Sequence, residues 1–368
     1  MDPKVYWVGF NLIKGIGSVR FQSIKEYFGD LEIAWQAPFA DLRAAGLSEK
    51  VCERILQLRK DFDLNKYVER IQSSGIQILI SDEENYPRYL KEIDQPPPVL
   101  YIKGELSLED EWSVAIVGTR KVTHYGRQVA QEFSRVLSDH KITIISGLAR
   151  GIDGIAHKAA IDGGGRTIAV LGSGVDRIYP AEHRTLAEEI TKSGAIVSDY
   201  APGTAPEASN FPPRNRIISG LSRATIVIEA GQTSGALITA EFANNQGRNV
   251  YAVPGSIYNV QSKGTNKLIQ QGAKPLLDIR DVLTDLQVEL IQERKSIRKA
   301  NPADSFEEKI LKLLSDEPMH VDEITNQTEL SISQVSSCLT MMELKGLAKQ
   351  VGGMKYTSVR EERGEYKK

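Results

Sequence analysis

Cysteine and histidine are scarce in this chain. Only two cysteines, Cys52 and Cys338, occur in 368 residues, and they lie far apart without a CxxC pattern. This argues against a disulfide framework and a structural zinc site, and it favours a reducing cytoplasm. The five histidines form neither an H-x-x-x-H nor an H-x-x-E-H pattern, so the sequence implies no metal and no cofactor.

Long apolar runs and an excess of one charge are also missing. No run approaches the roughly 18 residues that a membrane span needs, and the first residues lack the basic stretch of a secretory signal. The 46 Lys and Arg against 48 Asp and Glu give a net charge of -2. This argues against a generally basic nucleic-acid coat but allows a local basic groove. No Walker motif is present, which argues against an ATP motor.

Residues 1–70 are predicted to form a helical domain. Two similar segments, 12–18 and 42–48, place glycines between apolar stretches, and Ser18 and Ser48 are expected to cap the helices that follow. The segments resemble the helix-hairpin-helix pairs of SAM-like domains, which hold DNA phosphates with backbone N–H groups. The alternative is that the glycines only turn a helical bundle.

Residues 74–287 change to short β-branched runs that alternate with amphipathic stretches. Near-continuous Val and Ile runs indicate strands buried on both faces, and intervening helices indicate parallel crossovers. We therefore predict the α/β class, with a doubly wound, mostly parallel Rossmann-like sheet. The expected strands are residues 76–80, 114–117, 142–145, 167–171, 195–198, 225–228 and 249–253, and Pro96–Pro98 predict an extended entry into the sheet.

The C-terminal part predicts a linker at 288–304 and a winged helix at 305–360. Ser305 and Glu308 form a capping box ahead of an apolar stripe. Two further helices, at 322–327 and 331–347, precede a hairpin at 348–358, which is the order of a winged helix. Residues 331–344 contain no Lys or Arg, so weak contact with duplex DNA and contact with a protein are equal alternatives.

The carboxyl ends of the predicted strands are rich in glycine, and ligands of open parallel sheets bind there. Glycine lets the backbone approach a ligand closely, and free N–H groups at a helix start attract anions. We therefore predict a phosphate-binding rim, with Asp153 capping its helix, Glu229 orienting an arginine and His157 as a hydrogen-bonded supporting group. The four strand ends are residues 118–120, 146–157, 172–174 and 229–236.

Residues 210–222 place two arginines at the start of a predicted helix. Pro212 and Pro213 mark the helix start, so Arg214 and Arg216 oppose the helix dipole at a cost of about 0.3–1 kcal/mol each. A bound phosphate would use both, and pairing with Glu207 or Glu229 is the alternative. Residues 205–275 carry seven basic and three acidic residues, about +4. Phe211 has two alternative roles, stacking on a base and packing in the core.

Four motifs together resemble the DNA-processing protein A (DprA/Smf) family. They are Val117–Arg120, Ser146–Asp153, Asn210–Gly220 and Gly231–Ala236. The order of the three domains resembles the longer members, so the resemblance covers nearly the whole chain. It implies a cytoplasmic, non-catalytic protein that binds single-stranded DNA and protects it during natural transformation. It also implies loading of the RecA recombinase and a homodimer through the Rossmann-like domain, near residues 268–283.

The resemblance also indicates which residues contact DNA. They are Gly118, Arg120, Ser146, Gly147, Phe211, Arg214, Asn215, Arg216, Ser234, Gly235, Lys263 and Asn266. A competing hypothesis is an enzyme, because residues 231–235 resemble the P-G-G-x-G-T loop of phosphoribohydrolases that split nucleoside monophosphates. Ala230 in place of the proline and the intervening Ser234 depart from that loop. A nucleotide-binding regulator is the third hypothesis.

Overall fold

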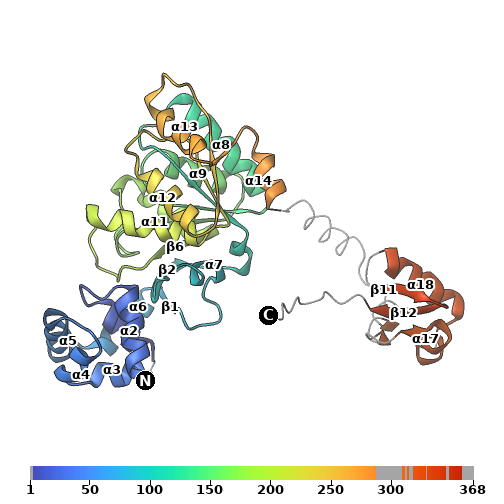
Figure 1. Ribbon diagram of the computed structural model, residues 1–368, viewed down its shortest axis with the longest axis horizontal. Coiled ribbons are helices and arrows are strands. Elements are labelled where there is room, and N and C mark those ends of the chain that lie inside the picture. The colour runs from blue at the N-terminus through green and yellow to red at the C-terminus, as the bar shows by residue number, and fades with distance from the viewer. Residues whose placement is uncertain are drawn as a thin grey trace. The chain divides into compact units, whose positions relative to one another are not determined.

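The chain divides into two compact units, residues 1–286 and 287–368, which Figure 1 draws as ribbons. This computed structural model describes residues 3–286, 309–310, 313–314, 318–328, 330–344 and 348–358. The predicted linker at 288–304 and the capping box at 305–308 lie outside the described residues. None of the described helices combines the length and the apolar character that crossing a membrane requires.

The first unit begins with six short helices. Asp30 and Asp63 cap two of them by accepting backbone N–H bonds. Of the two expected caps, Ser48 occupies the N-cap position of α5 but makes no capping side-chain bond. The prediction for Ser18 is wrong, because Gly17 is the N-cap and Ser18 is the first residue of α2. The helices are α1 (Lys4–Asn11), α2 (Ser18–Phe28), α3 (Leu31–Gln36), α4 (Phe39–Ala44), α5 (Glu49–Asp61) and α6 (Leu64–Ser73).

A sheet of nine strands follows, in the order β1-β2-β6-β5-β4-β3-β7-β8-β9. Strands β3 to β9 pair in parallel, whereas β1 pairs with β2 and β2 with β6 in antiparallel fashion. The predicted mostly parallel Rossmann-like sheet is therefore confirmed. The strands are β1 (Gln77–Ile80), β2 (Val99–Gly104), β3 (Ser113–Val117), β4 (Thr143–Ser146), β5 (Thr167–Val170), β6 (Gly194–Ser198), β7 (Ala224–Val227), β8 (Asn249–Ala252) and β9 (Lys274–Pro275).

Helices cover both faces of this sheet. One apolar cluster joins α7, α11 and α12 to one face through Leu90, Ile217 and Ala240, among others. On the other face α8, α9 and α10 contact β4, β5 and β6. The helices are α7 (Arg88–Lys91), α8 (His124–Asp139), α9 (Ile152–Asp162), α10 (Arg184–Ser193), α11 (Phe211–Gly220), α12 (Gly235–Asn245), α13 (Lys263–Gln270) and α14 (Ile279–Asp285).

The N-terminal helices share a hydrophobic core with the sheet. Phe10 and Ile71 belong to the same buried cluster as Tyr101 on β2 and Ile196 on β6. Lys4 adds a polar contact, because its Nζ donates to the backbone oxygen of Ile78 over 2.9 Å. The helical region therefore packs directly on the antiparallel edge of the sheet, where Figure 1 shows α6 beside β1.

The second unit has the order of a winged helix, as predicted. Its described elements are β10 (Met319–His320), α17 (Val321–Thr328), α18 (Ile332–Leu344), β11 (Ala348–Gly352) and β12 (Lys355–Ser358). The strands form one sheet in the order β10-β12-β11. Ile310, Ile324, Val335 and Leu339 form its core with several neighbours. The apolar spacing along α17 and α18 thus builds a small core of its own.

Candidate functional site at the strand ends

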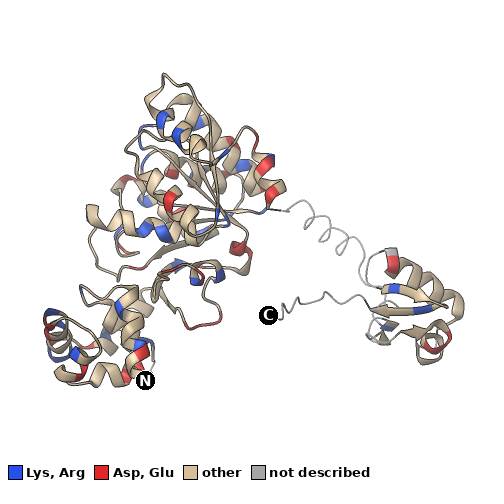
Figure 2. Ribbon diagram, viewed as in Figure 1, with Lys and Arg blue, Asp and Glu red and all other residues tan. Residues whose placement is uncertain are grey.

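A cleft of about 830 Å³ opens at the carboxyl ends of β3 and β7. Its wall includes the loop after β3, the start of α11, the loop that leads into α12 and the start of α13. Arg120, Lys121 and Lys263 line the cleft and are exposed. Within residues 3–286, none of their side chains makes a hydrogen bond or an ion pair. Figure 2 shows blue segments on α13, where Lys263 and Lys267 lie.

Glu229 fixes two loops of the cleft to one another. Its backbone oxygen accepts from the Thr119 N–H over 2.7 Å, and its buried carboxylate accepts from the N–H and the hydroxyl of Thr123. Gly126 leaves room for this carboxylate, because a Cβ there would collide with it. The predicted role of Glu229, to orient an arginine, is wrong. The carboxylate holds the N-terminus of α8 instead.

The Asp153 carboxylate binds the backbone of the glycine-rich loop after β4. It is the second residue of α9, and its Oδ2 accepts from the N–H groups of Gly147 and Ala149 over 3.2 and 3.3 Å. Capping of its own helix is therefore the wrong prediction, because the carboxylate binds the preceding loop. Burial raises the pKa of Asp153, and the nearby Arg214 guanidinium counteracts that rise.

Arg214 is buried in the wall of the cleft, with only 4% of its surface exposed. Its Nη1 donates to the backbone oxygen of Gly147 over 2.8 Å and to that of Val170. Burial lowers the pKa of Arg214 to about 10, so the guanidinium stays charged at neutral pH. Arg214 thus pairs with neither Glu207 nor Glu229, the alternative partners considered from the sequence, and backbone carbonyls beside Asp153 accept its hydrogen bonds.

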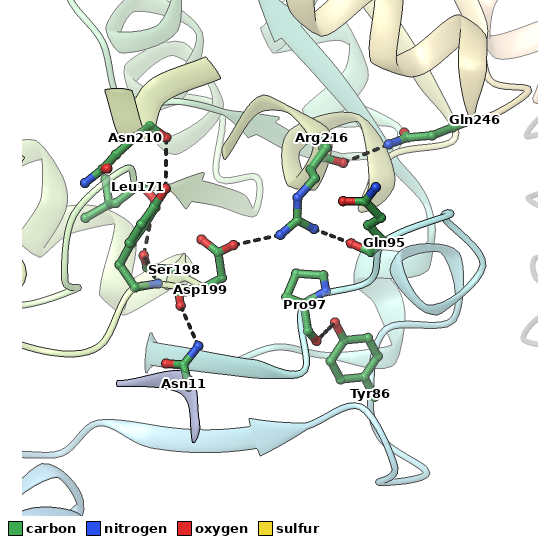
Figure 3. A network of polar contacts seen from close by, with 11 residues as sticks. Asn11, Tyr86, Gln95, Pro97, Leu171, Ser198, Asp199, Asn210, Arg216 and Gln246 are labelled. Atoms are coloured by element: carbon green, nitrogen blue, oxygen red, sulfur yellow. Dashed lines mark hydrogen bonds and ion pairs between the residues drawn. The ribbon is translucent and has the colours of Figure 1, made fainter. Parts of the chain in front are cut away.

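Arg216 lies outside the cleft lining, in the polar network that Figure 3 shows. Its Nη2 pairs with the Oδ2 of Asp199 at 2.8 Å, and its Nη1 donates to the backbone oxygen of Gln95 over 2.5 Å. The backbone oxygen of Asp199 accepts from Asn11 of α1 over 3.3 Å. Sequence reasoning missed Asp199. The network ties α11 to β6 and to the N-terminal helices, and the assignment of Arg216 to DNA stays a prediction.

The Arg216–Asp199 pair is expected to stabilise the fold. Asp199→Asn should lower the free energy of unfolding by about 1.5–3 kcal/mol, because a half-buried guanidinium loses its charged acceptor. Glu182→Gln is the matched control: it breaks the exposed Glu182–Arg150 pair and should cost less than about 1 kcal/mol. Urea titrations measure both values, and equal losses would contradict a stabilising network.

Two aromatic rings form one side of the cleft. The ring centroids of Phe211 and Tyr179 lie 5.6 Å apart, and the guanidinium of Arg214 lies 5.7 Å from the Phe211 centroid. Phe211 is half-buried and Tyr179 is 43% exposed. A Cβ at Gly172 would lie 3.0 Å from the Phe211 ring. Tyr179 was not predicted from the sequence, although an aromatic residue directly before a proline in the segment that follows β5 could have indicated it.

The other predicted residues divide into cleft lining and support. Gly118, Asn215, Ser234 and Gly235 line the cleft. The Asn215 amide donates to the Gly235 oxygen over 3.3 Å, and Ser234 caps α12. Three others support the cleft from outside its lining. The buried Ser146 hydroxyl donates to the backbone oxygen of Ile116 over 2.6 Å, and the Asn266 amide bonds the N–H and the oxygen of Gly255. The Gly147 N–H donates to Asp153, and its oxygen accepts from Arg214.

His157 is buried behind the cleft and is hydrogen-bonded, as expected. Its Nδ1 lies 2.6 Å from the Thr167 hydroxyl, and burial lowers its pKa to about 3. The imidazole is therefore neutral at physiological pH. The described part of the chain holds no group of three His, Cys, Asp or Glu side chains that could bind a metal ion.

The fold and the cleft define a Rossmann-like protein with exposed basic side chains at the carboxyl ends of its parallel strands, joined to a winged helix. The model of the family "DNA recombination-mediator protein A" matches residues 77–287, and that of the DprA winged helix domain matches residues 295–354. The chain belongs to the DNA recombination-mediator protein A family.

Relatives and solved structures extend this match over most of the chain. Protein Smf of Synechocystis is 37% identical over 96% of this chain and 98% of its own length, and Protein Smf of Escherichia coli is 35% identical over 91% and 93%. The X-ray structure of DNA processing protein A from Streptococcus pneumoniae covers 76% of this chain and 97% of its own, with a TM-score of 0.67 and 35% identity. A structure concerned with the single-stranded DNA binding mode of DNA processing protein A from Helicobacter pylori covers 58% and 96%, with a TM-score of 0.53 and 30% identity.

Proposed function

We propose that this protein binds single-stranded DNA in the cleft and acts as a recombination mediator without catalysing a reaction itself. The observation that carries the proposal is the set of exposed cations, Arg120, Lys121 and Lys263, that face the cleft without protein partners within residues 3–286. The similar protein from Helicobacter pylori supports it, since its structure concerns single-stranded DNA binding. Phosphates are the anions of DNA that such side chains bind.

The proposed contact needs charge and close approach rather than base readout. Arg120 and Lys263 neutralise phosphates, while α12 begins at Gly235 on the cleft wall, where the positive end of the helix dipole also favours an anion. Phe211 and Tyr179 offer ring faces on which bases can stack regardless of sequence. The buried Arg214 holds the loop at Gly147 in place. Binding of this kind is independent of sequence.

A titration across a salt series tests the proposed binding. We expect labelled single-stranded oligonucleotides to bind more tightly than duplexes, with log K falling against log salt by about 0.7 for each contacted phosphate. Fluorescence anisotropy measures both effects. An affinity that is insensitive to salt, or a preference for duplex, would contradict the proposal. Chromatography of nucleoside monophosphates incubated with the protein should reveal no free base, and release of base would favour the phosphoribohydrolase alternative.

The cellular role that we propose comes from the family. The protein would protect incoming single-stranded DNA during natural transformation and load the RecA recombinase on it, in the cytoplasm. We propose a role without catalysis because the two carboxylates next to the cleft, Asp153 and Glu229, are both buried and hydrogen-bonded to the protein itself. Strand exchange by purified RecA on DNA precoated with this protein is the direct assay.

We also propose a homodimer through the Rossmann-like unit, near residues 268–283. Leu277 lies in this segment with 78% of its surface exposed, which is unfavourable for an isolated leucine next to water. Leu277→Glu is expected to convert a dimer to a monomer, because the interface would then bury an unpaired charge. Analytical ultracentrifugation measures the change. Val19→Glu, at a similarly exposed apolar position on α2, is the matched control and should leave the mass unchanged.

A further inference from the structure

A second groove, of about 320 Å³, runs between α8 and α9 outside the cleft. On α8 it is lined by Arg127, Gln131 and Arg135, which follow one another at four-residue spacing and therefore share one side of the helix. Arg127 and Arg135 are both exposed. In the part of the first unit that the structure describes, neither guanidinium has a hydrogen-bond or ion-pair partner.

The opposite wall of the groove is formed mainly by α9 and carries one further cation. Gly151 and Gly154 line it, and Lys158 follows one turn later on α9. Asp162 is the one acidic side chain of the lining, and it already pairs with Lys158 at 3.0 Å. Two unpaired positive charges are therefore left in the groove, and at neutral pH they attract an anion.

The groove and the cleft are lined by segments of the chain that lie against each other. A Cβ on Gly151 would collide with the backbone of Thr119 and Arg120, so the start of α9 lies directly against the arginine-bearing loop of the cleft. A small hollow lined by Arg120, Ala149 and Arg150 lies at the same loop. Cations thus continue from Arg120 of the cleft to Arg127 and Arg135 of α8.

The spacing of these cations suits a chain of phosphates better than a single anion. Arg127 and Arg135 are eight residues apart on one helix, which places their Cα atoms about 12 Å apart along its axis. Successive phosphates of one strand can occupy both ends of that span. The lining contains no Phe, Tyr or Trp, and its one imidazole, that of His183, is bonded through Nδ1 to the backbone oxygen of Leu148 at 2.9 Å. The groove therefore offers mainly contacts to a backbone.

We propose that the groove between α8 and α9 binds the phosphates of the single strand after it leaves the cleft. This inference rests on the function proposed above and extends it by a second contact area. The groove supplies charge along the strand, so it adds affinity for long strands only. A short oligonucleotide that fills the cleft does not reach it.

The test is the double variant Arg127→Glu and Arg135→Glu in the full chain, with two oligothymidines. One has about 8 nucleotides, within the ~4–16 that a single binding fold covers, and the other has about 24. The double variant should bind the long strand at least about tenfold more weakly and the short one equally well. Its salt slope on the long strand should fall by about 1.4, for two lost phosphate contacts.

A matched control separates a local contact from the general field of the protein. Lys66→Glu with Lys192→Glu makes the same change in net charge at two exposed positions on α6 and α10, outside the lining of the groove and the cleft. It should leave both affinities within about twofold. Thermal unfolding of each variant checks that the fold is intact. If the charge-reversal double variant does not fold, Arg127→Gln with Arg135→Gln is tested in its place.

Each outcome decides between the two proposals. Loss on the long strand alone supports the groove. Equal loss of affinity for both strands, equal loss in the matched control, or no loss at all would contradict the groove proposal. Weaker binding by Arg120→Glu in the same assay would still support the cleft as a DNA site. If the unaltered protein binds neither strand, the proposed function itself fails, and the groove proposal fails with it.

Discussion

Arg120→Glu is expected to weaken binding of single-stranded DNA by about 100-fold at low salt. The guanidinium is exposed on the cleft wall without a protein partner among residues 3–286, so it is available for a charge-assisted bond worth about 1.5–3 kcal/mol. Each 1.4 kcal/mol is a factor of ten in affinity, and the new carboxylate adds repulsion. Fluorescence anisotropy at constant ionic strength gives the ratio.

Two controls make the Arg120 result specific. Arg120→Lys keeps the charge but loses the planar fork that binds phosphate oxygens in pairs, so its loss should be smaller. Lys66→Glu changes the net charge by the same amount on the exposed face of α6 and should leave binding almost unchanged. Because the Arg120 side chain makes no hydrogen bond or ion pair within residues 3–286, the unfolding free energy should stay within about 0.5 kcal/mol. Unaltered affinity in Arg120→Glu would remove the cleft as the DNA site.

Arg214→Met is expected to destabilise the fold by about 3–5 kcal/mol. The substitution removes the donor to the Gly147 and Val170 oxygens and leaves the buried Asp153 carboxylate without its nearby cation. DNA binding should fall too, because the loop after β4 loses the side chain that fixes it. Urea unfolding measures the first effect and anisotropy the second.

A double-variant cycle identifies the cause of that loss. Arg214→Met combined with Asp153→Asn removes both charges, so it should recover part of the stability that Arg214→Met loses. Strict additivity would show that Asp153 and Arg214 do not interact. A single variant as stable as the unaltered protein would contradict the buried position of the guanidinium. The sequence alone predicts that Arg214 binds phosphate, whereas its burial predicts that it also stabilises the fold.

Local patterns identified the sheet and the position of the cleft. The runs at 114–117 and 225–228 became β3 and β7, and their glycine-rich ends line the cleft. This part was predictable because burial on both faces leaves a Val and Ile signature in the strand itself. Strand β2 (Val99–Gly104) was expected only as an extended entry, since the prolines before it interrupt the pattern and its antiparallel pairing with β6 is a long-range feature.

The partners of the arginines could not be predicted. Asp199 pairs with Arg216 because the end of β6 lies next to α11 in space, and nothing near residue 216 in the sequence indicates this. Glu229 fits against Gly126, a contact over about one hundred residues of chain. The sequence shows that Arg214 and Arg216 lie at the start of a helix, where positive charge is unfavourable. Only the folded structure shows which protein groups their guanidiniums bind.

The anchoring of Thr119 and Thr123 by Glu229 has a consequence for recognition kinetics. The loop after β3, with Thr119 and Thr123, is joined to the loop after β7, with Glu229, by bonds of 2.5–3.0 Å. This part of the cleft is therefore preorganised before DNA binds. The two loops then lose little conformational entropy on association. Most of the conformational entropy lost on binding is that of the flexible DNA strand. The rate of capture should therefore depend on strand stiffness rather than on rearrangement of the protein.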